Sequence, residues 1–243
     1  MPAHPAPRDE HLAALLGLSN VLVERRSGEL STESRMRVLE RIELARLSVA
    51  AASAELSCES ERSDQTADYL NQKSAGTVQG LTVASIGVAA ATAIAGVLLA
   101  TNNATNESQD VVAIGGGLAT GGLGLGSLWV HPEINYAHPR NLLADVWNGP
   151  PSSMLYSPFV WAYLTRPEFS NSQEQSIREK IIDRWRRYQR IDKMPKEREL
   201  MFSSGGIYDA ALLRMRSQML DEVEAEVVLV NQDLEVLMTE LIH

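Results

Sequence analysis

The sequence predicts an all-α protein. A long antiparallel coiled-coil-like helical stalk is continued by a Gly/Ala-rich apolar helical hairpin, and a Pro- and aromatic-rich irregular segment follows. The hairpin is predicted by two apolar stretches of equal length, Leu81–Ala100 and Val111–Val130, which flank a polar tip. The stalk is predicted by two long amphipathic segments, Thr32–Lys73 and Tyr208–Ile242, on either side of the hairpin. Pairing these two segments removes both of their apolar stripes from water.

The composition sets the broad class of the protein. Of the 243 residues, 44% are hydrophobic, 22% are charged and only 5% are aromatic. These fractions belong to a folded protein, and the scarcity of aromatic residues favours helix. The net charge of −9 gives no general electrostatic case for binding nucleic acid. The single cysteine, Cys58, excludes an internal disulfide and a zinc site built from cysteines.

We expect five segments along the chain. These are an N-terminal tail with a short amphipathic helix (1–30), a long stalk helix (31–80), the apolar hairpin (81–130), a Pro- and aromatic-rich wrap (131–170), and C-terminal helices that include the returning stalk helix (171–243). The stalk helix is expected to continue into the first apolar stretch. Between the two, only Gly76 and Gly80 are weak helix formers.

Each apolar stretch suits a membrane-spanning helix, because twenty helical residues extend about 30 Å, the thickness of a bilayer core. Both stretches lack charged residues, and the tip between them lacks Arg and Lys. The simplest interpretation is a transmembrane hairpin with both termini on one side, which the positive-inside rule makes cytoplasmic. A periplasmic or secreted location applies if a signal peptide was removed. The alternative is a hairpin buried within a soluble helical assembly.

Small residues recur every four positions in each apolar stretch, so they line one face of each helix. Such a face lets two helix backbones approach closely. Spans this rich in small residues gain little from contact with lipid, so association with further copies is expected. The predicted helix-packing and oligomer face consists of Gly87, Ala91, Ala95, Ala113, Gly117 and Gly121.

Short helices are expected outside the stalk and the hairpin. Their predicted ranges are Asp9–Arg26, Arg140–Trp147 and Pro158–Leu164. A further helix is expected from a capping box at Ser170 or Asn171 to about Asp192, with Tyr188 on its apolar face. No stretch alternates as a strand does. The Trp and Tyr residues of 131–170 are interpreted as core residues, and a position among lipid headgroups is the alternative.

No motif in the chain predicts catalysis. The glycine-rich run Gly115–Gly126 lacks the Gly-Lys-Ser/Thr ending of a phosphate-binding loop, so helix packing explains it better. His131, Glu133 and His138 do not have the spacing of a zinc motif. Cys58 is expected to be a buried small apolar residue of the stalk. We therefore expect no enzyme activity, no cofactor and no metal site.

One basic cluster contains interleaved aromatic residues. Next to a membrane hairpin, such a helix can contact anionic headgroups. The candidate membrane-surface residues are Arg184, Trp185, Arg186, Arg187 and Arg190. In the alternative interpretation, Trp185 and Tyr188 are core residues and the arginines pair with Asp183, Asp192 or the acidic C-terminal helix.

Together these features predict a membrane-anchored, homo-oligomeric scaffold or interaction protein without catalytic activity. Its expected partners are further copies of itself, the lipid bilayer and a protein that binds the stalk, but not nucleic acid. A pore made of several Gly-rich hairpins is the first alternative, and a soluble helical assembly is the second. Neither span contains an ionisable residue, which favours the scaffold over the pore.

Overall fold

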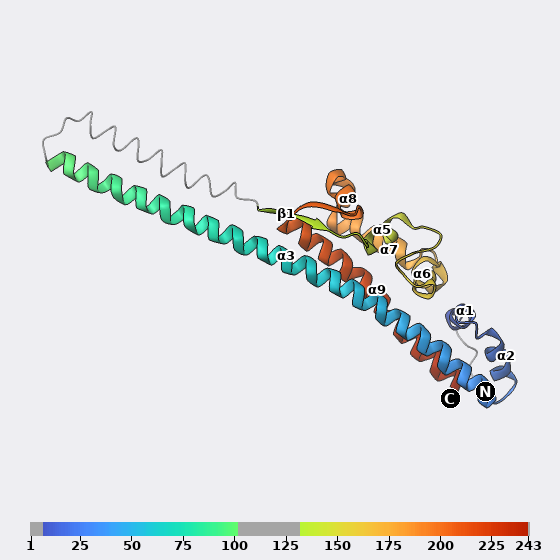
Figure 1. Cartoon of the computed structure of the whole chain (residues 1–243). Coiled ribbons are helices and arrows are strands. Elements are labelled where there is room, and N and C mark those ends of the chain that lie inside the picture. Colours follow the sequence, from blue (N-terminus) through green and yellow to red (C-terminus); the bar gives the residue numbers. More distant parts are fainter. Residues whose placement is uncertain (1–6, 102–131, 243) are drawn as a thin grey trace. The chain divides into compact units, whose positions relative to one another are not determined.

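The structure, a computed structural model, describes the backbone of residues 7–101 and 132–242 and the side chains of residues 8–76 and 132–242. The described part of the chain is mostly helical, at 76%, and also contains a two-stranded sheet, which confirms the predicted all-α class. The described elements (Figure 1) are the α-helices α1 (Pro7–Leu15), α2 (Ser19–Ser27), α3 (Thr32–Thr101), α5 (Leu142–Asn148), α6 (Pro158–Thr165), α7 (Ile177–Arg184), α8 (Pro195–Phe202) and α9 (Ala210–Ile242), the 3-10 helices η2 (Pro167–Phe169) and η4 (Ile191–Lys193), the π-helix η3 (Trp185–Gln189), and the strands β1 (Glu133–Ala137) and β2 (Gly205–Asp209).

The chain forms two compact units. The first contains the described residues of Met1–Asp64, Asn135–Gly206 and Leu212–His243, and the second contains those of Gln65–Ile134 and Ile207–Ala211. Helix α3 contributes residues to both units. The sites discussed below all lie in the first unit.

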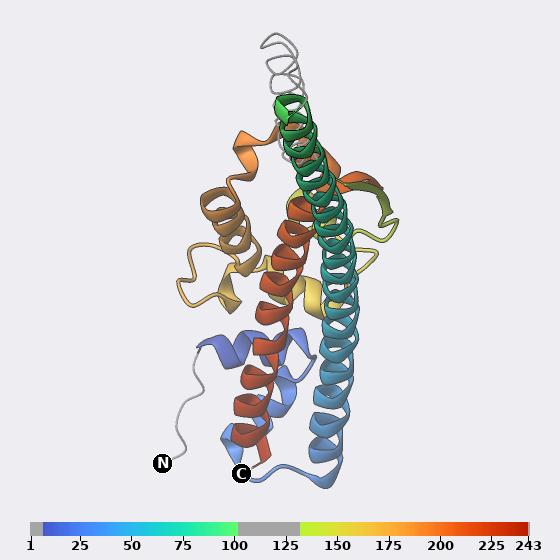
Figure 2. The same ribbon diagram turned by 90° about the vertical axis from the view of Figure 1, so that its left-hand side faces the viewer.

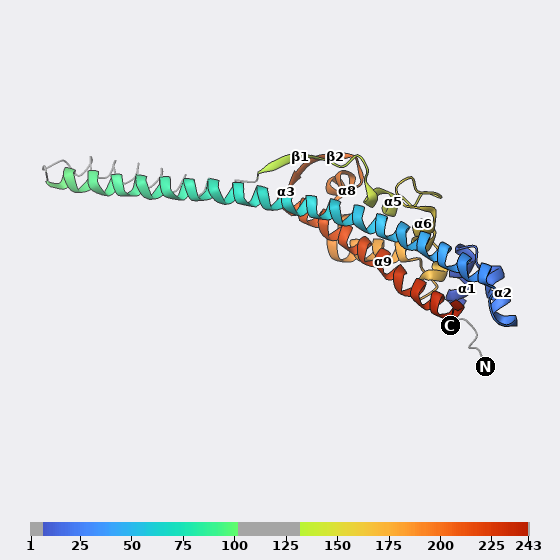
Figure 3. The same cartoon turned by 60° about the horizontal axis from the view of Figure 1, so that its bottom comes forward.

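In the first unit, α3 and α9 lie side by side (Figures 1, 2 and 3). Ser53 Oγ donates a hydrogen bond to Glu224 Oε1 at 2.8 Å, and Ser60 Oγ lies 2.9 Å from Ser217 Oγ. Residue numbers therefore rise along α3 as they fall along α9, so the two helices are antiparallel.

The facing sides of the two helices are apolar and buried. The buried residues are Val38, Ile42, Ala45, Val49, Ala52 and Leu56 on α3, and Val223, Val227, Val230, Leu234, Leu237 and Leu241 on α9. They recur every three or four positions, so each set occupies one stripe of its helix. Leu39 and Cys58 of α3 are exposed. The prediction of a buried Cys58 is wrong, since its position faces away from α9.

Polar residues enter this interface at Ser60 and Ser63, and both are buried. Ser60 Oγ donates to the carboxylate of Asp221, and Ser63 Oγ lies 3.1 Å from the Tyr136 hydroxyl. Each hydroxyl therefore has a partner, which offsets the cost of burying it.

The N-terminal segment contains two helices where one was expected. Gly17 separates α1 from α2 and has a φ of 72°, in the left-handed region that a glycine adopts without steric cost. The single helix predicted over Asp9–Arg26 is therefore wrong.

The two short helices predicted in the Pro- and aromatic-rich segment are confirmed as α5 and α6. Helix α6 begins after Ser157, whose hydroxyl accepts a hydrogen bond from the amide of Val160 at 3.2 Å. Trp161 and Tyr163 of this helix are buried. Their rings stack on Tyr156 and Phe169, with centroid distances of 5.6 and 4.9 Å, so these residues fill the protein core.

The helix expected to begin near Ser170 begins later. Helix α7 follows Ser176, which forms a capping box with Glu179. Gln173 has a φ of 56°, so the chain is not helical at the position that the prediction assigned to the first turn. The same capping-box spacing occurs several times in this region, and the last occurrence, Ser176 with Glu179, is the one used.

The expectation of no strand is also wrong. Strands β1 and β2 form a two-stranded sheet. Gly205, at the start of β2, has a φ of 129° and lies so close to Tyr136 and Ala137 that a Cβ would meet their backbones. Glycine is required there by both conformation and space.

The apolar hairpin lies largely outside the described residues. The backbone of α3 is helical to Thr101, so the expected continuation of the stalk helix is observed. The side chains of 77–101 and all of 102–131 are not described, which includes the whole of Val111–Val130.

Truncation of a buried stalk residue tests the packing of α3 on α9. Leu56→Ala removes a fully buried side chain and should lower the free energy of unfolding by about 2–5 kcal/mol, through lost burial and a cavity. Leu47 is 57% exposed on the same helix, so Leu47→Ala should change this free energy by less than about 0.5 kcal/mol. Urea unfolding followed by circular dichroism measures both. Equal losses would contradict the assigned faces.

Candidate functional site

The basic cluster at 184–190 includes a turn of π-helix, η3, at the end of α7. Such turns occur often at functional sites. Trp185 is fully buried, and its ring lies 5.9 Å from that of Phe202. Trp185 is therefore a core residue, and its predicted role at a membrane surface is wrong.

Arg184 and Arg186 are engaged by acidic neighbours. Arg184 Nη2 donates to Glu226 Oε1 of α9 at 2.8 Å. Arg186 Nε lies 3.3 Å from Asp192 Oδ2, and its guanidinium lies 5.5 Å from the centre of the Trp147 ring. The interpretation in which the arginines pair with nearby carboxylates therefore applies to these two residues.

Arg187 and Arg190 remain exposed, and neither forms an ion pair with another residue of the described part. Tyr188 is exposed as well, which corrects its expected place on the apolar face of the helix. We call Arg186, Arg187, Tyr188 and Arg190 the basic turn. This surface differs from the predicted set by the loss of Arg184 and Trp185 and the gain of Tyr188.

A buried arginine, Arg216, lies in the core next to the start of α9, and sequence reasoning missed it. Its Nη1 donates to Asn141 Oδ1 and to the Met201 carbonyl, both at 3.2 Å. Asn141 Nδ2 in turn donates to the carbonyls of Met201 and Ser203 at 2.9 and 2.7 Å. The sequence signal for its burial is its position on the helix, because Arg216 shares the apolar stripe with Leu213 and Leu220, which are both buried.

His138 belongs to the same buried region, with only 1% of its surface exposed. Burial, together with the nearby positive charges of Arg216 and Arg62, lowers the pKa of its imidazole to about 4. Of the two residues considered with it and rejected as metal ligands, His131 lies outside the described residues. Within the part that the structure describes, no three His, Cys, Asp or Glu side chains are grouped to hold a metal ion.

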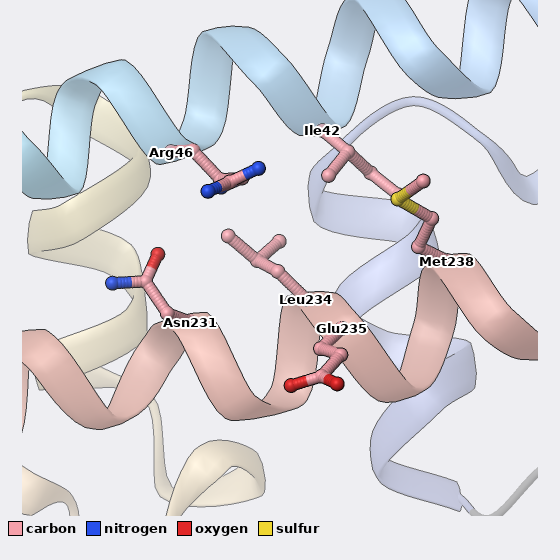
Figure 4. Close-up of a pocket in the computed structure, with 6 residues that line it drawn as sticks. All are labelled: Ile42, Arg46, Asn231, Leu234, Glu235 and Met238. Carbon is pink, nitrogen blue, oxygen red and sulfur yellow. The ribbon is translucent and has the colours of Figure 1, made fainter.

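A groove with a volume of about 240 Å³ runs between α3 and α9. Its lining residues are Ile42 and Arg46 on α3 and Asn231, Leu234, Glu235 and Met238 on α9 (Figure 4). Leu234 projects from α9 towards α3, and Met238 meets Ile42. Arg46 extends over the groove, whereas the Glu235 carboxylate points away from α3. We call this surface the α3/α9 groove.

The two charged residues of the α3/α9 groove make few contacts. The nearest carboxylate to Arg46 is Glu43, at 3.8 Å, and both side chains are exposed. Glu235 forms no ion pair with a described residue. An exposed pair at that distance contributes little stability. The groove therefore has an apolar floor and one exposed charge of each sign on its rim, of which Arg46 is paired only weakly with Glu43.

The predicted small-residue face falls outside the described side chains, so Gly87, Ala91, Ala95, Ala113, Gly117 and Gly121 have no structural account. In the part of the chain that the structure describes, no helix combines the length and the apolar character that crossing a membrane requires.

Comparison of the chain with protein-family models, with curated proteins and with solved structures finds no match. The function is therefore argued from the residues and their geometry.

His138 predicts a specific pH dependence of stability. Its pKa is about 4 in the folded protein and 6.5 when unperturbed, so between these values the unfolded chain binds a proton that the folded chain does not. Stability should therefore fall as the pH drops through this window, by about 3 kcal/mol at most. His138→Gln should reduce the slope of the free energy of unfolding against pH in this window.

Urea unfolding of both proteins between pH 7 and pH 4 measures this effect. The carboxylates contribute equally to the pH dependence of both proteins. The difference between the two slopes of unfolding free energy against pH is therefore due to His138. Identical slopes would show that His138 is not held neutral by burial.

Proposed function

We propose that this protein is a membrane-anchored, self-associating helical scaffold without catalytic activity. In this proposal, α3 and α9 form a coiled-coil-like stalk and Leu81–Val130 forms a membrane-inserted hairpin. The observation that carries the proposal is the length of α3, whose backbone is one helix from Thr32 to Thr101. The stalk helix and the first apolar stretch therefore belong to one continuous helix, as expected if this helix passes from water into a bilayer.

The sequence of the hairpin supports insertion. Leu81–Ala100 and Val111–Val130 each have the length of a bilayer core and contain no charged residue. Each also carries a face of small residues, and such faces associate within membranes by close backbone contact. Self-association through these faces is part of the proposal.

The basic turn supports contact with an anionic membrane surface. Arg186, Arg187 and Arg190 concentrate positive charge on a chain whose net charge is −9. Each Lys or Arg near an anionic leaflet contributes about 1 kcal/mol of attraction. Tyr188, exposed among them, is of the residue type that is favoured at the level of the headgroups.

The absence of catalysis is proposed from the sequence, in which no acid–base pair, nucleophile or metal motif stands out. The expected partners are further copies of the chain, the bilayer and a protein that contacts the stalk.

Cysteine labelling tests the membrane topology. With both termini in the cytoplasm, the hairpin tip faces the outside. In a Cys58→Ser background, Asn103→Cys should then react with a membrane-impermeant maleimide on intact cells. Native Cys58 is exposed on the stalk and serves as the matched control, because it should react only after permeabilisation.

Labelling of Asn103→Cys only after permeabilisation would contradict the topology, and full recovery of the protein without detergent would contradict anchoring. Dye release from liposomes that contain the protein separates the scaffold from a pore. A scaffold should leave the dye inside, whereas release would favour the pore.

A further inference from the structure

The α3/α9 groove carries the exposed charged side chains of Arg46 and Glu235, whereas the opposite side of α9 contacts other helices. Asp233 of α9 binds Arg8 of α1 at 2.6 Å, and Glu226 binds Arg184 of α7 at 2.8 Å. Asp233 and Glu226 are seven residues apart, so they share one face of the helix. Glu235 lies two residues beyond Asp233, roughly half a turn away. The groove side of α9 therefore faces away from α1 and α7.

Apolar residues extend the groove along both helices. Leu39 precedes Arg46 by seven residues and Val228 precedes Glu235 by seven, so each lies on the groove side of its own helix. Leu39 is 41% exposed and Val228 is 44% exposed. The surface is therefore a lengthwise apolar strip with Arg46 on one wall and Glu235 on the other.

This arrangement is complementary to itself. Arg46 and Glu235 line the same groove from the two helices. Ser53 lies opposite Glu224 and Ser60 opposite Ser217, so Arg46 lies opposite Asn231, and Glu235 is about one helical turn, roughly 6 Å, further along α9. A two-fold axis parallel to the helices keeps each residue at its level and sets α3 of one copy against α9 of the other. The long side chain of Arg46 of each copy then extends along the pair to Glu235 of the other, and two ion pairs form around a shared apolar strip. A different partner would need matching charges of its own.

The size of the surface also suits a second copy. The part of α3 that lies alongside α9 in the first unit spans Thr32–Asp64. At 1.5 Å per residue and about 10 Å per helix diameter, the face of the pair measures roughly 50 by 20 Å. That is about the 800 Å² per partner that a stable interface buries.

We infer that the α3/α9 groove is a dimer interface, in which two copies of this chain pair their stalks into a four-helix bundle closed by reciprocal Arg46–Glu235 ion pairs. All four helices are then antiparallel to their neighbours, as in up-and-down bundles. Leu39 and Val228 enter the bundle core on either side of these ion pairs. The inference goes beyond the proposed function, which places self-association in the hairpin, because this interface lies on the stalk.

Charge reversal tests the interface in the full chain. Sedimentation velocity over a range of concentrations should give a dimer for the wild type. Arg46→Glu and Glu235→Arg should each raise the dissociation constant at least about tenfold, because each places like charges opposite one another. The double variant restores both pairs with reversed polarity and should recover most of the wild-type affinity.

Glu40→Arg is the matched control. Glu40 is exposed on α3 and lies about a third of a turn round from Arg46, so its reversal should leave the dimer unchanged. A wild-type monomer, or a double variant as weak as the single ones, would overturn the inference. The hairpin is tested separately with Gly117→Leu. An oligomer that this change abolishes and Glu235→Arg does not would overturn the groove interface and leave the proposed function standing.

Discussion

The structure of the first unit depends on the mutual burial of two apolar stripes, one on α3 and one on α9. Exposure of either stripe to water is unfavourable, because each fully buried Val or Leu stabilises the folded state by about 1.5–3 kcal/mol. Antiparallel pairing buries both stripes along their whole shared length. The remaining elements pack around this pair. Helix α1 attaches to α9 through Arg8 and Asp233, and α7 attaches through Arg184 and Glu226.

Apolar stripes alone tolerate a shift of one helix past the other, and the buried polar groups remove that freedom. Ser60 pairs with Ser217 and Asp221 at one level of the two helices. Arg216 Nη1 donates to Asn141 Oδ1 and to the Met201 carbonyl. A shift by one helical turn would separate these partners and leave buried polar groups unpaired, at a cost of several kcal/mol for a charged group.

The parts of the fold that follow from periodicity were predicted from the sequence. The apolar stripe of α9 is buried from Met219 to Leu241 as expected, and α3 continues into the first apolar stretch. The parts that depend on tertiary contacts were missed. Arg216 is buried because Asn141, distant in sequence, supplies an acceptor. The π-helix at Trp185–Gln189 turns Tyr188 outwards, and a period of 3.6 residues cannot anticipate that shift.

The sites were less predictable than the fold. The basic cluster was found by composition. Only the structure shows that Arg184 contacts Glu226, that Arg186 contacts Asp192 and that Trp185 is buried, whereas Arg187 and Arg190 are exposed without an ion pair to a described residue. The α3/α9 groove had no sequence signal, because Arg46 and Glu235 are ordinary surface charges until the two helices are placed side by side. Their significance comes from lining the same groove from opposite helices.

An engineered disulfide between α3 and α9 tests the pairing and its register most directly. The Ser60 and Ser217 hydroxyls lie 2.9 Å apart, so cysteines at these positions can form a disulfide with little movement. In a Cys58→Ser background, oxidised Ser60→Cys/Ser217→Cys protein should contain an intramolecular crosslink by mass spectrometry. Ser60→Cys/Glu224→Cys, displaced along α9 by seven residues, should not. A crosslink only in the displaced pair, or in neither pair, would contradict the antiparallel register on which the account depends.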